Sequence, residues 1–334
     1  MQKAVILPQS LGSGTRFDAS QERSPNSEIR MKFQCLNDEL WSFVIRVSSF
    51  LLVLVPSAAV RAADSPAKAH KSRPPLPEGV VVERDISYLG ADRAEKGDLY
   101  LPAKREPNRR IPAVLIVHGG GWSGGDKDSA REWNIGGTLA SNGYAGFSIN
   151  YILNNKAKGI NAWPQDLYDC KTAVRWLRKN ADRYGIDPEH IGAIGGSAGG
   201  HLVSMLAVTG PADGLEPDGP YGEFPTRIHC VIDLYGPIVF GHCGAIKPTD
   251  DLKSSPFTYL DKNDPPVLIL HGTADKTVDL ERSREFDAAL AKAGVEHELV
   301  VVEGGVHSFH LQPSQRDLRP VALAFFDKHL KAGK

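Results

Sequence analysis

The chain has 334 residues, of which 41% are hydrophobic, 24% are charged and 8% are aromatic. This composition can fill a sizeable hydrophobic core, and it excludes an intrinsically disordered or collagen-like protein. The 39 basic and 40 acidic residues nearly cancel, and no long run of Lys or Arg occurs, so an electrostatic nucleic-acid-binding surface is excluded as well.

An apolar stretch, VSSFLLVLVPSAAV, occupies residues 47–60. Basic residues precede it, with Arg46 the nearest, and small residues follow it, which is the layout of a secretory signal peptide. The stretch is shorter than the roughly 20 residues of a membrane-spanning helix, and it contains Pro56. We therefore expect a signal peptide that is cleaved after Ala62 rather than an uncleaved anchor.

Three regions are predicted along the chain. Residues 1–62 are expected to be an N-terminal extension and signal peptide, within which Met31 is a candidate start, and this leader predicts a secreted or periplasmic protein without stable membrane insertion after its removal. Residues 63–79 are rich in Pro, Lys and Ala without periodicity, and they predict a solvated linker. Residues 80–334 are expected to form one folded domain.

Three cysteines, Cys170, Cys230 and Cys243, follow the predicted leader. They show neither a CxxC motif nor the spacing of metal ligands, so no metal site is predicted. One disulfide between two of them and three buried free thiols both remain open at this point. No organic cofactor is predicted either.

Strands and helices are expected to alternate through the domain. The predicted strands are residues 80–88, 98–101, 112–118, 144–151, 190–194, 229–234, 266–271 and 298–303. Helices are predicted at 164–184, directly after residue 197, at 280–293 and at 319–331. Continuous apolar runs suit strands that are buried on both faces of a sheet. The pattern predicts an α/β fold with a mostly parallel, eight-stranded sheet and helices on both of its faces.

The sharpest motif is GGSAGG at residues 195–200, between a predicted strand and a predicted helix. On such a tight turn a serine hydroxyl projects from the edge of the sheet, and the glycines permit close backbone contacts. Ser197 is therefore the predicted nucleophile. A glycine-rich phosphate or turn loop with an incidental serine is the alternative, but the other parts of a hydrolytic site follow in order.

A second glycine-rich motif, HGGGW, follows the apolar strand PAVLIVH. Successive glycines let backbone N–H groups point at one spot, where they can stabilise the oxyanion of a tetrahedral intermediate. We predict Gly120, Gly121 and Ala198 as the donors of this oxyanion hole, with a shift by one glycine left open. Trp122 is predicted to bind substrate.

A nucleophilic serine needs a histidine base, and the base needs a carboxylate that orients it. Asp275 lies on the loop that leaves a buried strand in the motif HGTADKTVD, and it is the predicted carboxylate. Asp279 is the competitor, but it is expected to cap the helix that follows.

His307, in the motif GGVHSFH, is the predicted base, since two glycines allow its loop to turn back toward the serine. His310 is its rival. The remaining histidines have ordinary explanations: His118 and His201 are expected to buttress the two glycine loops, and His271 to end a strand.

Taken together, HGGGW, GGSAGG, HGTADKTV and GGVHSFH resemble the motifs of the α/β-hydrolase esterases. The resemblance is closest to the hormone-sensitive-lipase-like group and to secreted carbohydrate esterases of the acetylxylan or feruloyl esterase type. It extends from about Val80 to the C-terminus, and it implies the α/β-hydrolase fold. The lipase-like group usually carries an acidic residue before the nucleophile, where this chain has Gly196, and this departure favours the carbohydrate-esterase branch.

Little chain is available for a lid over the site. Lipase-like relatives build much of their cap before the first strand, where this chain has only the Pro-rich segment. The other irregular stretches, residues 209–226 and 237–264, are short and rich in Gly and Pro. We predict a minimal lid and a shallow site that is open to bulky or polymeric alcohols.

The predicted function is that of a secreted serine carboxylesterase that acts on short-acyl esters through an acyl-enzyme. Acetyl or feruloyl esters of polysaccharides are the candidate substrates, so the expected partner is a small-molecule or polysaccharide ester. Amide hydrolysis by a peptidase or an arylformamidase-like enzyme on the same triad is a second reading, because His-Gly-Gly-x-Trp loops also occur in formamidase relatives. A non-catalytic binding protein is a third, although no residue of the triad is missing. The oligomeric state is left open.

Overall fold

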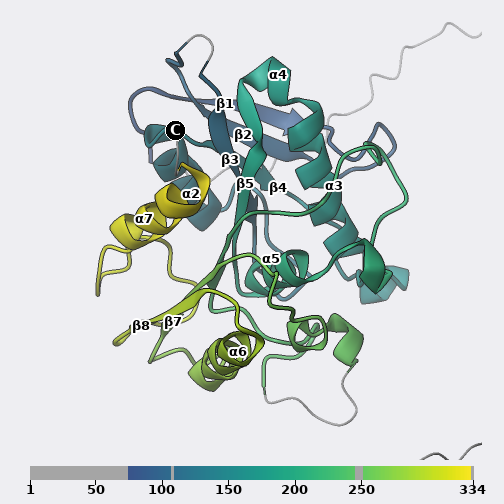
Figure 1. Ribbon diagram of the computed structural model, residues 1–334, viewed down its shortest axis with the longest axis vertical. Coiled ribbons are helices and arrows are strands. Elements are labelled where there is room, and N and C mark those ends of the chain that lie inside the picture. Colours follow the sequence, from purple (N-terminus) through teal and green to yellow (C-terminus); the bar gives the residue numbers. More distant parts are fainter. Residues whose placement is uncertain (1–73, 107–108, 245–250, 332–334) are drawn as a thin grey trace, which may run out of the picture. The chain divides into compact units, whose positions relative to one another are not determined.

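The computed structural model describes residues 74–331, except 107–108 and 245–250 (Figure 1). The predicted leader with its cleavage site, the candidate start at Met31 and most of the predicted linker lie outside the described residues. At the end of that linker, Leu76 packs against Tyr100 and Trp133. Within the described part of the chain, no helix combines the length and apolar character that crossing a membrane requires.

Eight strands form one sheet in the order β1-β2-β4-β3-β5-β6-β7-β8. They are β1 (Val80–Ile86), β2 (Gly97–Pro102), β3 (Ile111–Val117), β4 (Ala145–Ile149), β5 (Ile186–Gly196), β6 (Val231–Leu234), β7 (Val267–Gly272) and β8 (His297–Val302). The pairs β1–β2 and β2–β4 are antiparallel, and all later pairs are parallel. The predicted mostly parallel, eight-stranded sheet is confirmed.

Helices cover both faces of this sheet (Figure 1). They are α2 (Ala130–Ser141), α3 (Gln165–Lys179), α4 (Ala181–Tyr184), α5 (Ala198–Val208), α6 (Leu280–Ala293) and α7 (Arg319–Leu330). Along β3, Leu115 and Val117 belong to the core shared with α3, α5 and α6, whereas Val114 and Ile116 belong to the core shared with α2 and α7. Alternate side chains of a strand point to opposite faces, so a strand buried on both faces reads as one continuous apolar run.

Three elements differ from the sequence prediction. The helix expected at 164–184 is interrupted at Asn180, which separates α3 from α4. β5 begins at Ile186 rather than at residue 190. α2 was not predicted, because two glycines in its middle weaken the helical pattern. A Cβ on one of them, Gly136, would lie 2.7 Å from the ring of Tyr100, so glycine is what lets α2 approach the sheet closely.

The loops that carry the four motifs leave the C-terminal ends of β3, β5, β7 and β8. These strands are parallel, so their C-terminal ends meet at one edge of the sheet, where ligands bind in open α/β sheets. Among the described residues of the two segments expected to hold a lid, the only helical pieces are three-residue 3₁₀ helices, namely Pro211–Asp213, Leu252–Ser254 and Pro256–Thr258. The described residues of these two segments therefore agree with the predicted minimal lid.

The three cysteines of the domain are free in the structure. Cys170 and Cys230 are buried, and Cys243 is half-buried. Of the two readings left open by the sequence, the structure takes the one with free thiols.

Candidate active site

Ser197 is the single residue between the end of β5 and the start of α5. Its backbone has φ 57° and ψ −124°, a region that residues with a side chain rarely occupy and that tight functional turns stabilise. The glycine before the turn is required by space, because a Cβ on Gly195 would lie 2.3 Å from the carbonyl oxygen of Gly199. The serine therefore stands on a strained strand-to-helix turn, as predicted for a nucleophile elbow.

The structure brings the three predicted triad residues together. Nε2 of His307 lies 3.0 Å from Oγ of Ser197, and Nδ1 of His307 lies 2.7 Å from Oδ2 of Asp275. The Asp275 side chain is buried, while that of His307 is 15% exposed. This arrangement lets the imidazole accept a proton from the serine on one side while the carboxylate orients it from the other.

Asp275 is held by more groups than the histidine alone. Its carboxylate accepts hydrogen bonds from the backbone amides of Thr277 and Val278, and Nε2 of the buried His271 lies 3.2 Å from Oδ2. Burial would raise the pKa of Asp275, but the hydrogen bonds from His271, His307 and the two amides outweigh it and hold the pKa well below its usual range. Asp275 is therefore an anion.

The contact of His271 with Asp275 was not predicted from the sequence. Besides Asp275, the ring of His271 contacts the hydroxyl of Ser283, with Nδ1 and Oγ 2.6 Å apart. The histidine thus links the carboxylate to α6 instead of merely ending a strand. The spacing of four residues between His271 and Asp275 was the available signal, but only the turn after β7 shows that they meet.

The predicted oxyanion loop runs beside the serine. A Cβ on Gly119 would lie 3.1 Å from Cβ of Ser197, and the next residues, Gly120 and Gly121, have φ values of 123° and 59°. Positive φ is accessible to glycine without strain. Ala198 is the first residue of α5, where backbone N–H groups have no partner within the helix. Of the predicted donors, Gly120 and Gly121 therefore lie on the loop beside Ser197, and Ala198 begins the helix that follows it.

Trp122 was expected to bind substrate, but the structure buries it, with 3% of its surface exposed. Its ring packs 5.4 Å from that of His201 and 4.9 Å from that of Phe240. Trp163 and Phe240, which are half-buried, complete this aromatic cluster. His201 lies one helical turn after Ser197, so the cluster adjoins the nucleophile, and its more exposed rings are those of Trp163 and Phe240.

The other histidines and the rival carboxylate have structural roles. His118 donates from Nδ1 to the carbonyl of Gly119 and stacks on Tyr151, so it supports the first glycine loop as expected. Nε2 of His201 bonds the carbonyl of Ser254, which lies outside both glycine loops. Asp279 caps α6 through the amide of Glu281. His310 accepts a hydrogen bond from the amide of Gln312.

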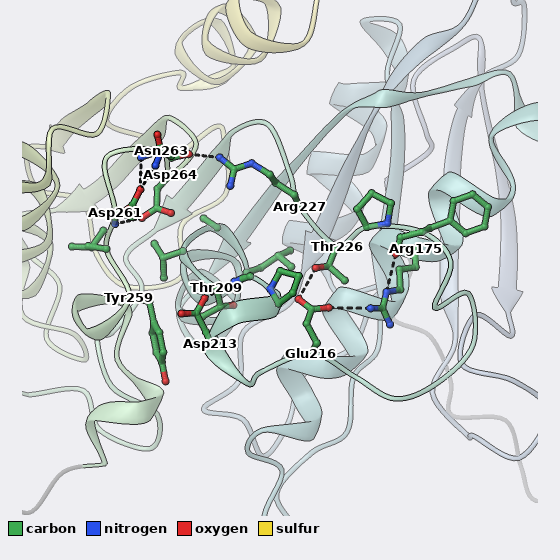
Figure 2. A pocket seen from close by; sticks show the side chains of 18 of the residues that line it. Arg175, Thr209, Asp213, Glu216, Thr226, Arg227, Tyr259, Asp261, Asn263 and Asp264 are labelled. Carbon is green, nitrogen blue, oxygen red and sulfur yellow. Dashed lines mark hydrogen bonds and ion pairs between the residues drawn. The ribbon is translucent and has the colours of Figure 1, made fainter.

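A large cavity of about 710 Å³ lies away from these residues, beyond the C-terminal end of α5 (Figure 2). Thr209, Glu216 and Tyr259 are among its lining residues. Glu216 is paired there with Arg175, as the dashed lines show. α5 separates this cavity from Ser197, so its size does not make it the reaction site. No group of acidic, histidine or cysteine side chains suited to a metal ion occurs within the described residues.

Comparison with known proteins finds likeness to several hydrolases. Residues 97–254 match the BD-FAE family, and residues 238–333 match the prolyl oligopeptidase family. The probable carboxylic ester hydrolase LipM of Mycobacterium tuberculosis is 29% identical over 60% of this chain and 50% of its own length, and the esterase LipQ of the same organism is 28% identical over 63% and 53%. The chain thus spans about half the length of these relatives.

The solved structures that resemble this chain match it over a larger share of both lengths. A truncated form of a carbohydrate esterase from gut microbiota superposes with a TM-score of 0.66 at 26% identity, covering 76% of this chain and 98% of that one. Thermogutta terrifontis esterase 2 phosphonylated by sarin gives 0.64 at 27% identity, over 76% and 96%. The sheet order, the elbow and these likenesses together show the α/β-hydrolase fold, and the relatives named above are esterases.

Proposed function

We propose that the protein is a carboxylic ester hydrolase with Ser197 as its nucleophile. The observation that carries the proposal is the unbroken chain of contacts from Oγ of Ser197 through the imidazole of His307 to the carboxylate of Asp275. Esterases among the relatives and structural neighbours support the same reaction class.

The reaction proceeds in two steps. Oγ of Ser197 attacks the ester carbonyl carbon while its proton passes to Nε2 of His307, and the oxyanion is stabilised by backbone N–H groups of Gly120, Gly121 and Ala198. His307 returns the proton to the leaving alcohol, so the acyl group stays on the serine. A water molecule that gives a proton to His307 then attacks the acyl-enzyme, and the acid leaves as the serine recovers its proton.

Short-acyl esters, including acetyl and feruloyl esters of polysaccharides, are the proposed substrates. Three similar proteins support this proposal: one structural neighbour is a carbohydrate esterase, another is a bifunctional GH43-CE protein, and a relative is an endo-1,4-beta-xylanase. The minimal lid leaves room for a bulky alcohol. A series of p-nitrophenyl esters from acetate to decanoate tests the acyl preference, and a maximum beyond eight carbons would contradict it.

Amide hydrolysis is a second candidate, because the residues that match the prolyl oligopeptidase family, 238–333, include both Asp275 and His307. The ester and the amide of one acyl group, p-nitrophenyl acetate and p-nitroacetanilide, separate the two reactions. We expect kcat/KM to be larger for the ester.

The role of Ser197 is tested by Ser197→Ala with p-nitrophenyl acetate. We expect kcat to fall by about three orders of magnitude or more, because a triad without its nucleophile retains only the assistance of the remaining site. Ser204→Ala is the matched control, since Ser204 is a buried serine two turns along the same helix, and its kcat should stay close to that of the parent protein. A Ser197→Ala protein with a tenth of the parent rate would overturn the proposal.

A further inference from the structure

The space beneath the serine elbow is filled by Arg131, the second residue of α2. A Cβ on Gly196 would lie 2.5 Å from Nη1 of Arg131 and 2.7 Å from its Cζ, and a Cβ on Gly119 would lie 3.2 Å from Nη2. The guanidinium therefore lies against the backbone of both the elbow and the oxyanion loop. This contact gives a physical reason for glycine at position 196, because any side chain there would meet the guanidinium.

The charge of Arg131 is balanced within the protein. Nε and Nη2 lie 2.7 and 2.6 Å from Oε1 of Glu132, whose side chain is 1% exposed. Burial lowers the pKa of Arg131, but its contacts with Tyr235 and Glu132 outweigh that effect and raise the pKa above its ordinary value. Arg131, whose side chain is 12% exposed, is thus a cation with a fixed orientation, since its planar donors are spread over two different partners.

The second partner is Tyr235, the first residue after β6. Its hydroxyl accepts a hydrogen bond from Nη1 of Arg131, at 3.0 Å, and donates one to the carbonyl oxygen of Phe309. Burial raises the pKa of Tyr235 to about 12, so the hydroxyl keeps the proton that it donates. Phe309 is two residues beyond His307, and the chain of contacts therefore reaches the loop of the base.

The ring of Tyr235 contacts the base directly. Its centroid lies 4.9 Å from that of the His307 imidazole, at an interplanar angle of 61°, which is a favourable edge-to-face contact. Tyr235 is fully buried and has φ 47°, a conformation that a bulky residue adopts only where its surroundings require it. The tyrosine thus touches the imidazole with its ring and holds the following loop with its hydroxyl.

We propose that Arg131 and Tyr235 are positioning residues that fasten the oxyanion loop, the serine elbow and the His307 loop to one another. This inference rests on the proposed ester hydrolysis. The three loops leave three different strands: β3 and β5 pair directly as far as Val117 and Gly195, whereas β6 and β7 lie between β5 and β8. Hydrogen bonds of the sheet therefore do not join the His307 loop directly to the other two. The polar chain from Glu132 through Arg131 and Tyr235 to Phe309 does so, and a displacement of about 1 Å between reacting groups can cost a hundredfold in rate.

Tyr235→Phe gives the sharpest test, because it removes the hydroxyl and keeps the ring against His307. We expect kcat for p-nitrophenyl acetate to fall about tenfold or more, with KM changed less than about twofold, because the loss falls on positioning and not on substrate binding. Tyr144→Phe is the matched control: Tyr144 is fully buried, and its hydroxyl donates to Asp327 on α7. The Tm of the two variants should fall by similar amounts, but Tyr144→Phe should keep the kcat of the parent protein.

Arg131→Met, Arg131→Lys and the double variant of Arg131→Met with Tyr235→Phe extend the test. Lysine keeps the charge but not the planar fork, so it should not restore kcat. If the two residues act as one chain, the double variant should lose no more rate than Arg131→Met alone. Arg178→Met is the control, because the buried Arg178 also bonds two partners, the carbonyls of Pro225 and Arg227.

The outcomes separate this inference from the proposed function. A parent protein that hydrolyses no ester would overturn the proposed function. An active parent with an unchanged kcat in Tyr235→Phe, or additive losses in the double variant, would overturn the positioning role and leave the proposed function standing. Should Arg131→Met fail to fold, the comparison of Tyr235→Phe with Tyr144→Phe decides by itself.

Discussion

His201 illustrates how burial near the nucleophile sets the state of a single residue. It is fully buried one helical turn after Ser197, in contact with Trp122 and with the carbonyl of Ser254. Burial lowers the pKa of His201 to about 4, although the hydrogen bond to Ser254 opposes the shift. The imidazole is therefore neutral at neutral pH, and its role is to support the aromatic cluster beside the elbow.

This pKa predicts a pH-dependent stability. The unfolded chain binds a proton at position 201 near pH 6.5, whereas the folded chain does so only near pH 4, so protonation favours unfolding between these values. The contribution of His201 to the free energy of unfolding should be complete above pH 6.5 and fall toward pH 4, by at most about 1.4 kcal/mol per pH unit.

Denaturant unfolding of the parent and of His201→Gln at pH 7, 6 and 5 measures this effect. Glutamine can still donate to the carbonyl of Ser254, so the variant isolates the titration from the loss of the hydrogen bond. We expect a shallower pH dependence in His201→Gln. Identical slopes in the two proteins would contradict the assignment.

At the scale of elements, the close approach of α2 to the sheet carries the site. α2 brings Arg131 beneath the elbow, and the helix packs on β2 with no side chain at Gly136. Because a Cβ there would lie 2.7 Å from the ring of Tyr100, Gly136, one of the two glycines that weaken α2 as a sequence pattern, is required by its tertiary packing. In this helix the low helix propensity of glycine conflicts with the packing against Tyr100, and the packing decides which residue is present.

Gly136→Ala should therefore destabilise the protein. Alanine is favoured over glycine in a helix by about 1 kcal/mol, but overpacking against a buried ring costs about 1–3 kcal/mol, so the net effect is a lower Tm. Gly137→Ala is the control in the same helix, since its Cβ would meet Pro77 at 3.1 Å and Leu76 at 3.6 Å but no buried aromatic ring. Thermal unfolding measures both variants, and a Gly136→Ala protein as stable as Gly137→Ala would refute this account of the packing.

Over the whole described domain, the two ends of the parallel strands have different roles. The C-terminal ends of the parallel strands carry the triad, and the opposite ends face the large cavity, where Glu216 lies 3.0 Å from the buried cation Arg175 (Figure 2). Glu216 also lies 2.7 Å from the buried cation Lys171. α5 spans the distance between the triad and the cavity, about 16 Å at 1.5 Å per residue. The ion cluster therefore stabilises the fold without touching the reacting groups.

Glu216→Gln should separate stability from activity. Removing the counterion of a buried cation costs about 3–5 kcal/mol, so Tm should fall by several degrees, while kcat of the folded protein for p-nitrophenyl acetate should stay the same. Glu223→Gln is the control, because the Glu223–Lys179 pair is exposed and such pairs contribute about 0–1 kcal/mol. A large loss of kcat in Glu216→Gln would show that the two ends are coupled.

The sequence by itself determined the alternation of strands and helices, the eight strands and the four motifs with Ser197, Asp275 and His307. These features are local: an apolar run, a glycine turn and a residue after a strand each depend on a few neighbours along the chain. For that reason the helix at 280–293 was placed without error, because its cap at Asp279 and its final Gly294 are adjacent to it.

Only the tertiary structure decided which distant groups meet at the site. The burial of Trp122 and the chain from Arg131 through Tyr235 to Phe309 join residues that come from different strands, helices and loops. No local pattern encodes them, since each depends on the order of parallel strands in the sheet and on how closely α2 packs against it. Sheet order and helix packing are set by the burial of the whole core, and therefore by all of its residues together.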